Sequence, residues 1–92
     1  VGFLPGAAGA EMQIKMLERD DIDVLVVGES REWETVEYTR DAVKQGRAKA
    51  LILMGHVASE EEGMRNCAQW LKTFLPGIPI EFLPAGEPFW RP

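Results

Sequence analysis

A chain of 92 residues is long enough for one small domain and too short for two. Hydrophobic residues make up 46% of it and charged residues 27%, but no apolar run approaches the roughly 20 residues that a membrane span requires. The formal net charge of -5 argues against a broad nucleic-acid-binding face, because such a face needs Lys and Arg to displace counterions.

The cysteine content indicates the cellular compartment, and the first residues indicate how this chain relates to a longer polypeptide. Cys67 is the single cysteine, so it cannot form a disulfide within the chain, and this suits the reducing cytoplasm. The chain starts at Val1 with an apolar, strand-like stretch and shows no signal-peptide pattern. We expect residues 1–92 to form a single α/β domain that is the C-terminal piece of a longer, two-part polypeptide.

Four short apolar runs alternate with three segments of helical character. The runs are "VGFL" (1–4), "DVLVV" (23–27), "ALILM" (50–54) and "IPIEFL" (78–83), and the helical segments are 8–19, 31–46 and 59–74. The two middle runs are apolar on both faces, which is typical of interior strands in a parallel sheet covered by helices. The pattern predicts a β-α-β-α-β-α-β fold with a mostly parallel sheet and right-handed crossovers.

Apolar stripes indicate which sides of the helices pack. In the last helical segment, apolar residues recur at three- and four-residue spacing and form one such stripe: Met64, Cys67, Ala68, Leu71 and Leu75. Cys67 is therefore interpreted as a packed thiol and not as a nucleophile. Trp33 and Val36 are expected in the core. In the tail, Phe89 and Trp90 could close over the sheet edge, enter a subunit contact or pack in the core.

In a parallel α/β sheet the loops that leave the carboxyl ends of the strands carry function, and three loops qualify here. The first, "PGAAGAE" (5–11), has Gly6 and Gly9 ahead of a helix, so its free amides could cradle a phosphate or another anion. It lacks the Lys-Ser/Thr pair of a P-loop. A tight turn after Pro5 explains the glycines equally well.

The second loop, "GESREWE" (28–34), offers a carboxylate at the same edge of the sheet. Glu29 directly follows a buried strand and Gly28. Three roles are open for it: an acceptor that orients an imidazole, a base for a bound water, or a solvated loop acid.

The third loop, "GHVASEEEG" (55–63), contains the one histidine of the chain. Ser59 and Glu62 have capping-box spacing, which predicts that the helix starts at Ser59 and leaves His56 in the loop. His56 and Glu60 would then project above the sheet edge, and imidazole plus carboxylate is a usual ligand pair for zinc, manganese, iron or cobalt. The alternative is an ordinary loop histidine beside acids that stabilise a helix N-terminus.

The string "GHVASEEEGMRNCAQWL", preceded by "DVLVVGE" and followed by "EFLPAGEPFW", resembles the C-terminal end of the Nif-three-like dinuclear-metal family. Bacterial members are often labelled GTP cyclohydrolase I type 2 homologues. The resemblance covers nearly all 92 residues in order, and its specific part is the Gly-His element followed after three residues by Glu. It implies that His56 and Glu60 are metal ligands, while a histidine pair and an acid in the N-terminal part supply the others.

The same resemblance implies two divalent ions (Zn, Mn, Fe or Co) per full-length subunit, a toroidal homohexamer and a small-molecule substrate. We expect a metal-dependent hydrolase in which Glu29 is a catalytic acid or base near the ligands. The alternative is a non-catalytic metal-binding scaffold or regulatory module. One departure stands out: many relatives have a histidine in the second loop, and this chain has Trp33 at about that position.

Overall fold

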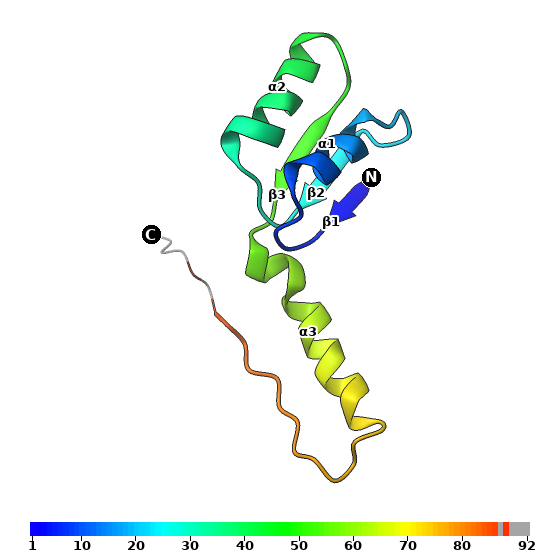
Figure 1. Cartoon of the computed structure of the whole chain (residues 1–92), viewed down its shortest axis with the longest axis vertical. Coiled ribbons are helices and arrows are strands. Elements are labelled where there is room, and N and C mark those ends of the chain that lie inside the picture. Colours follow the sequence, from blue (N-terminus) through cyan, green and yellow to red (C-terminus); the bar gives the residue numbers. More distant parts are fainter. Residues whose placement is uncertain (87, 89–92) are drawn as a thin grey trace.

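The computed structural model of the chain describes residues 1–86 and 88. Strands β1 (Gly2–Leu4), β2 (Val24–Val27) and β3 (Ala50–Leu53) alternate with helices α1 (Ala10–Glu18), α2 (Glu37–Lys44) and α3 (His56–Lys72) (Figure 1). The strands are all parallel and lie in the order β1-β2-β3. The predicted α/β class with a parallel sheet is therefore confirmed for this part of the chain.

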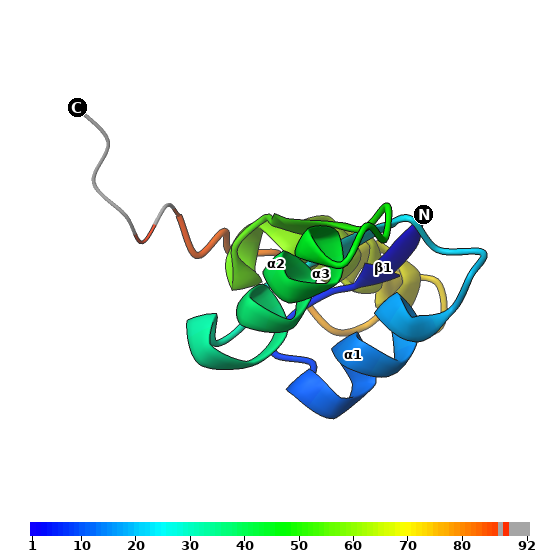
Figure 2. The same ribbon diagram turned by 90° about the horizontal axis from the view of Figure 1, so that it is seen from above.

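The core lies between the sheet and the two helices that connect its strands. Because both crossovers move in the same direction along the sheet, α1 and α2 lie on the same face (Figure 2). Leu17 from α1 packs against Leu25 and Val27 from β2, and all three side chains are completely buried. The central position of the run 23–27 in the sheet is thus confirmed.

The opposite face of the sheet carries no helix among the described residues. Phe3, Val26 and Ile52 stand in register across the three strands and point to this face. Phe3 is 52% exposed and Ile52 is 49% exposed. An apolar row of this kind normally lies under a second layer, since parallel sheets are usually covered on both faces.

The prediction of a fourth strand at 78–83 is wrong. Within the described residues this segment forms no strand and runs back along α3 (Figure 1). The Phe82 ring centroid lies 4.5 Å from the Arg65 guanidinium carbon. Pro79 has no N–H to give to a strand ladder, which disfavours a place inside a sheet. As a result β3 is an edge strand, not the interior strand predicted from its apolar run.

The segment predicted as one helix over 31–46 begins with a wider turn. Residues Glu32–Val36 form a five-residue π-helical turn before α2. Thr35 and Thr39, four residues apart, face the interior, and Trp33 is 73% exposed. The expectation that Trp33 lies in the core is therefore wrong, because the wider turn brings Thr35 to the buried side instead.

Helix α3 begins three residues earlier than predicted. Gly55 takes a positive φ of 95° and turns the chain, so that His56 is already the first helical residue. Ser59 lies inside the helix and makes no capping contact, which makes the predicted capping box wrong.

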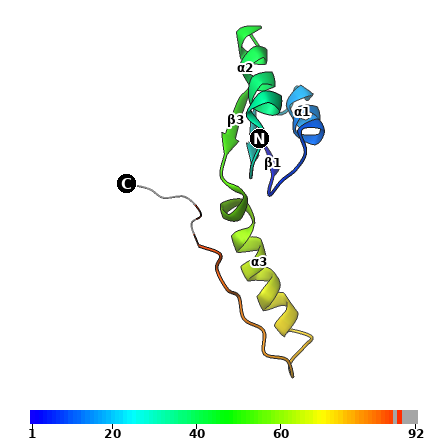
Figure 3. The same cartoon turned by 60° about the vertical axis from the view of Figure 1, so that its left-hand side comes forward.

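Helix α3 projects away from the sheet (Figure 3). Like the other described helices, it lacks the length and apolar character that crossing a membrane demands. Phe89 and Trp90 lie outside the described residues.

Candidate metal site

Three backbone hydrogen bonds bring the ends of the strands together beyond the sheet. The Gly28 amide donates to the Leu4 carbonyl at 3.1 Å, and the Glu29 amide donates to the Gly6 carbonyl at 3.1 Å. On the other side, the Gly55 amide donates to the Gly28 carbonyl at 2.8 Å. The first loop, the second loop and the start of α3 are therefore fixed side by side at the carboxyl edge, where α/β sheets carry their sites.

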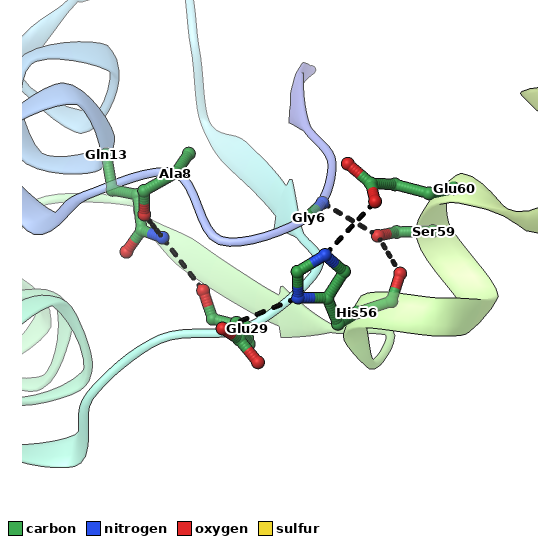
Figure 4. Close-up of polar contacts among 7 residues, drawn as sticks. All are labelled: Gly6, Ala8, Gln13, Glu29, His56, Ser59 and Glu60. Carbon is green, nitrogen blue, oxygen red and sulfur yellow. Dashed lines mark hydrogen bonds and ion pairs between the residues drawn. The ribbon is translucent and has the colours of Figure 1, made fainter. Parts of the chain in front are cut away.

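His56 lies between two carboxylates at this edge (Figure 4). Its Nε2 is hydrogen-bonded to Oε2 of Glu60 at 3.0 Å, across one turn of α3. Its Nδ1 lies 3.5 Å from Oε1 of Glu29, which is an ion-pair distance longer than a good hydrogen bond. The structure thus brings together all three residues that the sequence singled out, and each side chain is roughly half exposed.

The donor atoms of His56 and Glu60 fit one shared ion. Two ligand atoms bound at 2.0 to 2.1 Å to a tetrahedral ion lie roughly 3.3 Å apart, and these two atoms are 3.0 Å apart. Glu29 faces Nδ1, the other ring nitrogen, so from this side of the imidazole it cannot bind the ion that Nε2 and Glu60 would share. It can accept a hydrogen bond from Nδ1–H, as carboxylates behind zinc-bound histidines do, and Nε2 would then bind a metal in place of its hydrogen bond to Glu60.

The pair by itself is an incomplete ligand set. Among residues 1–86 and 88, no group of three or more His, Cys, Asp or Glu side chains is arranged to hold a metal ion. A catalytic zinc ion usually takes three protein ligands. His56 and Glu60 can therefore supply two ligands, and a tightly held ion needs others from outside this group.

Ser59 connects the first loop to α3, a contact different from the helix cap that its spacing to Glu62 predicted. Its Oγ accepts a 2.9 Å hydrogen bond from the Gly6 amide and donates one of 2.8 Å to the His56 carbonyl. The Gly6 amide is therefore already engaged, which removes it from the anion cradle considered for this loop. Gly6 instead forms a turn with a φ of 67°, in agreement with the tight-turn interpretation.

Gln13 is a residue that sequence reasoning missed. It is 1% exposed, and its Nε2 donates to the carbonyl oxygens of Ala8 and Glu29 at 2.6 and 2.9 Å. Its Oε1 accepts from the Thr35 hydroxyl at 2.6 Å. The available signal was its position four residues before Leu17, which puts a polar side chain on the buried side of α1. Gln13 thereby links the first loop to the loop that carries Glu29.

Two cavities adjoin the His56 side chain. One, of about 530 Å³, lies between His56, Glu29 and the returning tail at Pro84. The other, of about 420 Å³, runs between α3 and residues 80–85, with His56 and Glu60 at one end and apolar side chains such as Leu71 along it. A small molecule could approach the imidazole from either side.

Comparisons with protein-family models, with curated proteins and with solved structures found no match to the chain. The interpretation of the site therefore rests on its own geometry and on the sequence resemblance.

Proposed function

We propose that this chain is the C-terminal part of a cytoplasmic protein that binds two divalent metal ions and hydrolyses a small-molecule substrate. His56 and Glu60 are two of the metal ligands, and Glu29 is the catalytic acid or base beside them. The observation that carries the proposal is the 3.0 Å approach of His56 Nε2 to Glu60 Oε2, with Glu29 behind the ring at 3.5 Å.

Each of the three side chains has a distinct task in this proposal. His56 binds through Nε2, and Glu60 binds through the oxygen that faces it. Glu29 accepts a hydrogen bond from Nδ1–H and so favours the tautomer that leaves Nε2 for a metal. When bound, the metal ions would supply water activation and stabilisation of the charge on the attacked centre.

Glu29 is also placed to take part in proton transfer. Its side chain lines the cavity of about 530 Å³ beside His56 and is roughly half exposed. A water molecule bound in that cavity would lie within reach of the carboxylate, which could accept a proton from it and return the proton to a leaving group. The adjoining apolar cavity suits a substrate with a non-polar portion.

The remaining metal ligands and the partners come from outside the group formed by His56, Glu60 and Glu29. We propose that the N-terminal part of the same polypeptide provides a histidine pair and an acid, and that subunits form a homohexamer. The uncovered row of Phe3, Val26 and Ile52 supports a further layer of polypeptide on this sheet.

Elemental analysis of the parent protein, the full-length polypeptide that contains this chain, tests the assignment of His56 and Glu60 as metal ligands directly. We expect about two metal ions per subunit, and a clear loss of metal in the His56→Ala and Glu60→Ala variants. Glu61→Ala is the matched control, because Glu61 is an acid of the same turn without a polar contact to His56 among the described residues. Unchanged metal content in both ligand variants would refute the assignment.

A non-catalytic, metal-binding scaffold or regulatory module is the second candidate. The open apolar face of the sheet favours it, because such a surface serves assembly. Two results would point to this function. The metal-loaded parent protein would turn over no phosphoester, amide or nucleotide, and it would stay hexameric only while the metal is present.

A further inference from the structure

Gly6 lies directly against the Glu60 carboxylate. It is buried, and a Cβ atom added to it would overlap the Glu60 side chain, with Cδ only 2.9 Å away. Real Cβ atoms essentially never come within 3.0 Å of a heavy atom outside their own residue and its two chain neighbours. The carboxylate therefore occupies the space that a side chain on Gly6 would take.

Ser59 holds the same two segments together from the helix side. Its Oγ bridges the Gly6 amide and the His56 carbonyl, so one hydroxyl group connects the first loop to the first turn of α3. Glu60 is the next residue along the helix, and His56 is three residues earlier. The bridge sets the distance between the loop and both proposed ligands.

We propose that Gly6 and Ser59 are positioning residues that seat the Glu60 carboxylate against the His56 imidazole. This inference rests on the proposed metal-binding function. Ligand atoms must be held within roughly 0.5 Å of the productive geometry, and a side chain on Gly6 would push the carboxylate further than that. Gly6 acts through the space it leaves, and Ser59 acts through the bridge.

A simpler reason for glycine at this position is its backbone conformation, because φ is 67° and other residues are strained there. Gly46 separates the two explanations. It has a similar φ of 82°, and an added Cβ would meet nothing within 4 Å. Gly6→Ala and Gly46→Ala therefore share the backbone cost, and only Gly6→Ala displaces the carboxylate.

Zn²⁺ titration of the parent protein by calorimetry compares these variants. We expect Gly6→Ala to bind Zn²⁺ about 10 to 100 times more weakly, the range typical when the surroundings that orient a metal ligand are altered. Gly46→Ala should bind as the native protein does. Ser59→Ala should also weaken binding, and Ser59→Thr should restore it, because threonine keeps the hydroxyl group. Equal affinities for Gly6→Ala and Gly46→Ala would overturn the proposal.

A measurement without metal separates this inference from the metal assignment. The NMR signals of the His56 ring, identified by their loss in His56→Ala, report whether Glu60 still contacts Nε2. Gly6→Ala and Ser59→Ala should move these signals toward their positions in Glu60→Ala, and Gly46→Ala should not. Native signals in both variants would refute the positioning role. Native protein that fails to bind Zn²⁺ would instead refute the proposed function. If Gly6→Ala does not fold, the positioning role is tested by the Ser59 variants alone, through the loss in Ser59→Ala and its recovery in Ser59→Thr.

Discussion

The amide of Gly6 donates a 2.9 Å hydrogen bond to Oγ of Ser59, 53 residues further along the chain. This bond joins the loop after the first strand to the first turn of the last helix. Helix α3 otherwise projects away from the sheet (Figure 3). The Gly55–Gly28 hydrogen bond places the start of α3 beside the loop of Glu29, and the Gly6–Ser59 bond adds a second attachment one turn further along the helix.

Replacing Glu29 tests the carboxylate behind the imidazole. Glu29→Gln keeps the shape of the side chain and removes the charge 3.5 Å from Nδ1. We expect Zn²⁺ affinity to fall about tenfold or more, and less than it falls in His56→Ala, since the ligands themselves remain. Glu32→Gln, an exposed acid close by, is the control for the change in net charge. Equal affinities in the two variants would exclude a role for Glu29 behind the ring.

Gln13 and Thr35 should be strongly coupled in stability. The two side chains share a buried 2.6 Å hydrogen bond. Gln13→Ala should lower the free energy of unfolding by about 2 to 4 kcal/mol, because it opens a cavity and leaves buried polar groups without partners. A double-mutant cycle with Thr35→Val, measured by urea unfolding, should give a coupling of about 0.5 to 3 kcal/mol. Strictly additive effects would contradict the observed network.

The two faces of the sheet should respond differently to truncation. Leu25 is completely buried under α1, and Leu25→Ala should cost about 2 to 5 kcal/mol of unfolding free energy. Ile52 is 49% exposed on the uncovered face, so Ile52→Ala in the isolated chain should cost less than about 1.5 kcal/mol. Chemical denaturation of both variants provides the comparison. A large loss for Ile52→Ala would show that something covers this face in solution.

The Arg19–Asp21 pair gives a prediction about pH. The side-chain hydrogen bond from Arg19 lowers the pKa of Asp21 from 3.8 to about 2. Since the pKa is lower in the folded state, the pair adds stability above pH 3.8, and this contribution is lost as the pH falls toward about 2. Native protein and Asp21→Asn should therefore differ in unfolding free energy near neutral pH and converge as the pH falls below about 2. A difference that does not change with pH would contradict the pairing.

Local patterns in the sequence were sufficient for much of the fold and for the central pair of the site. The apolar runs at 1–4, 23–27 and 50–54 became the three strands, because short β-branched and aliphatic runs between helical segments suit a buried parallel sheet. The loop that follows the third run predicted that His56 and Glu60 lie together at the sheet edge, although with His56 outside the helix, whereas the structure places both on one side of α3. The alternation of strands and helices placed Glu29 at the same edge.

The tertiary structure decided the features that depend on a distant partner. A strand at 78–83 needs another strand to pair with, and the segment contacts α3 instead. The exposure of Trp33 followed from a widened turn that no periodicity indicates. The roles of Gly6 and Ser59 arise from a contact between residues 53 positions apart. Sequence by itself therefore determined the three strands, the approximate positions of the helices and the donor atoms that reach the edge, because these depend on neighbours along the chain. Only the folded chain set the distances between them, because they depend on packing between residues that the sequence keeps apart.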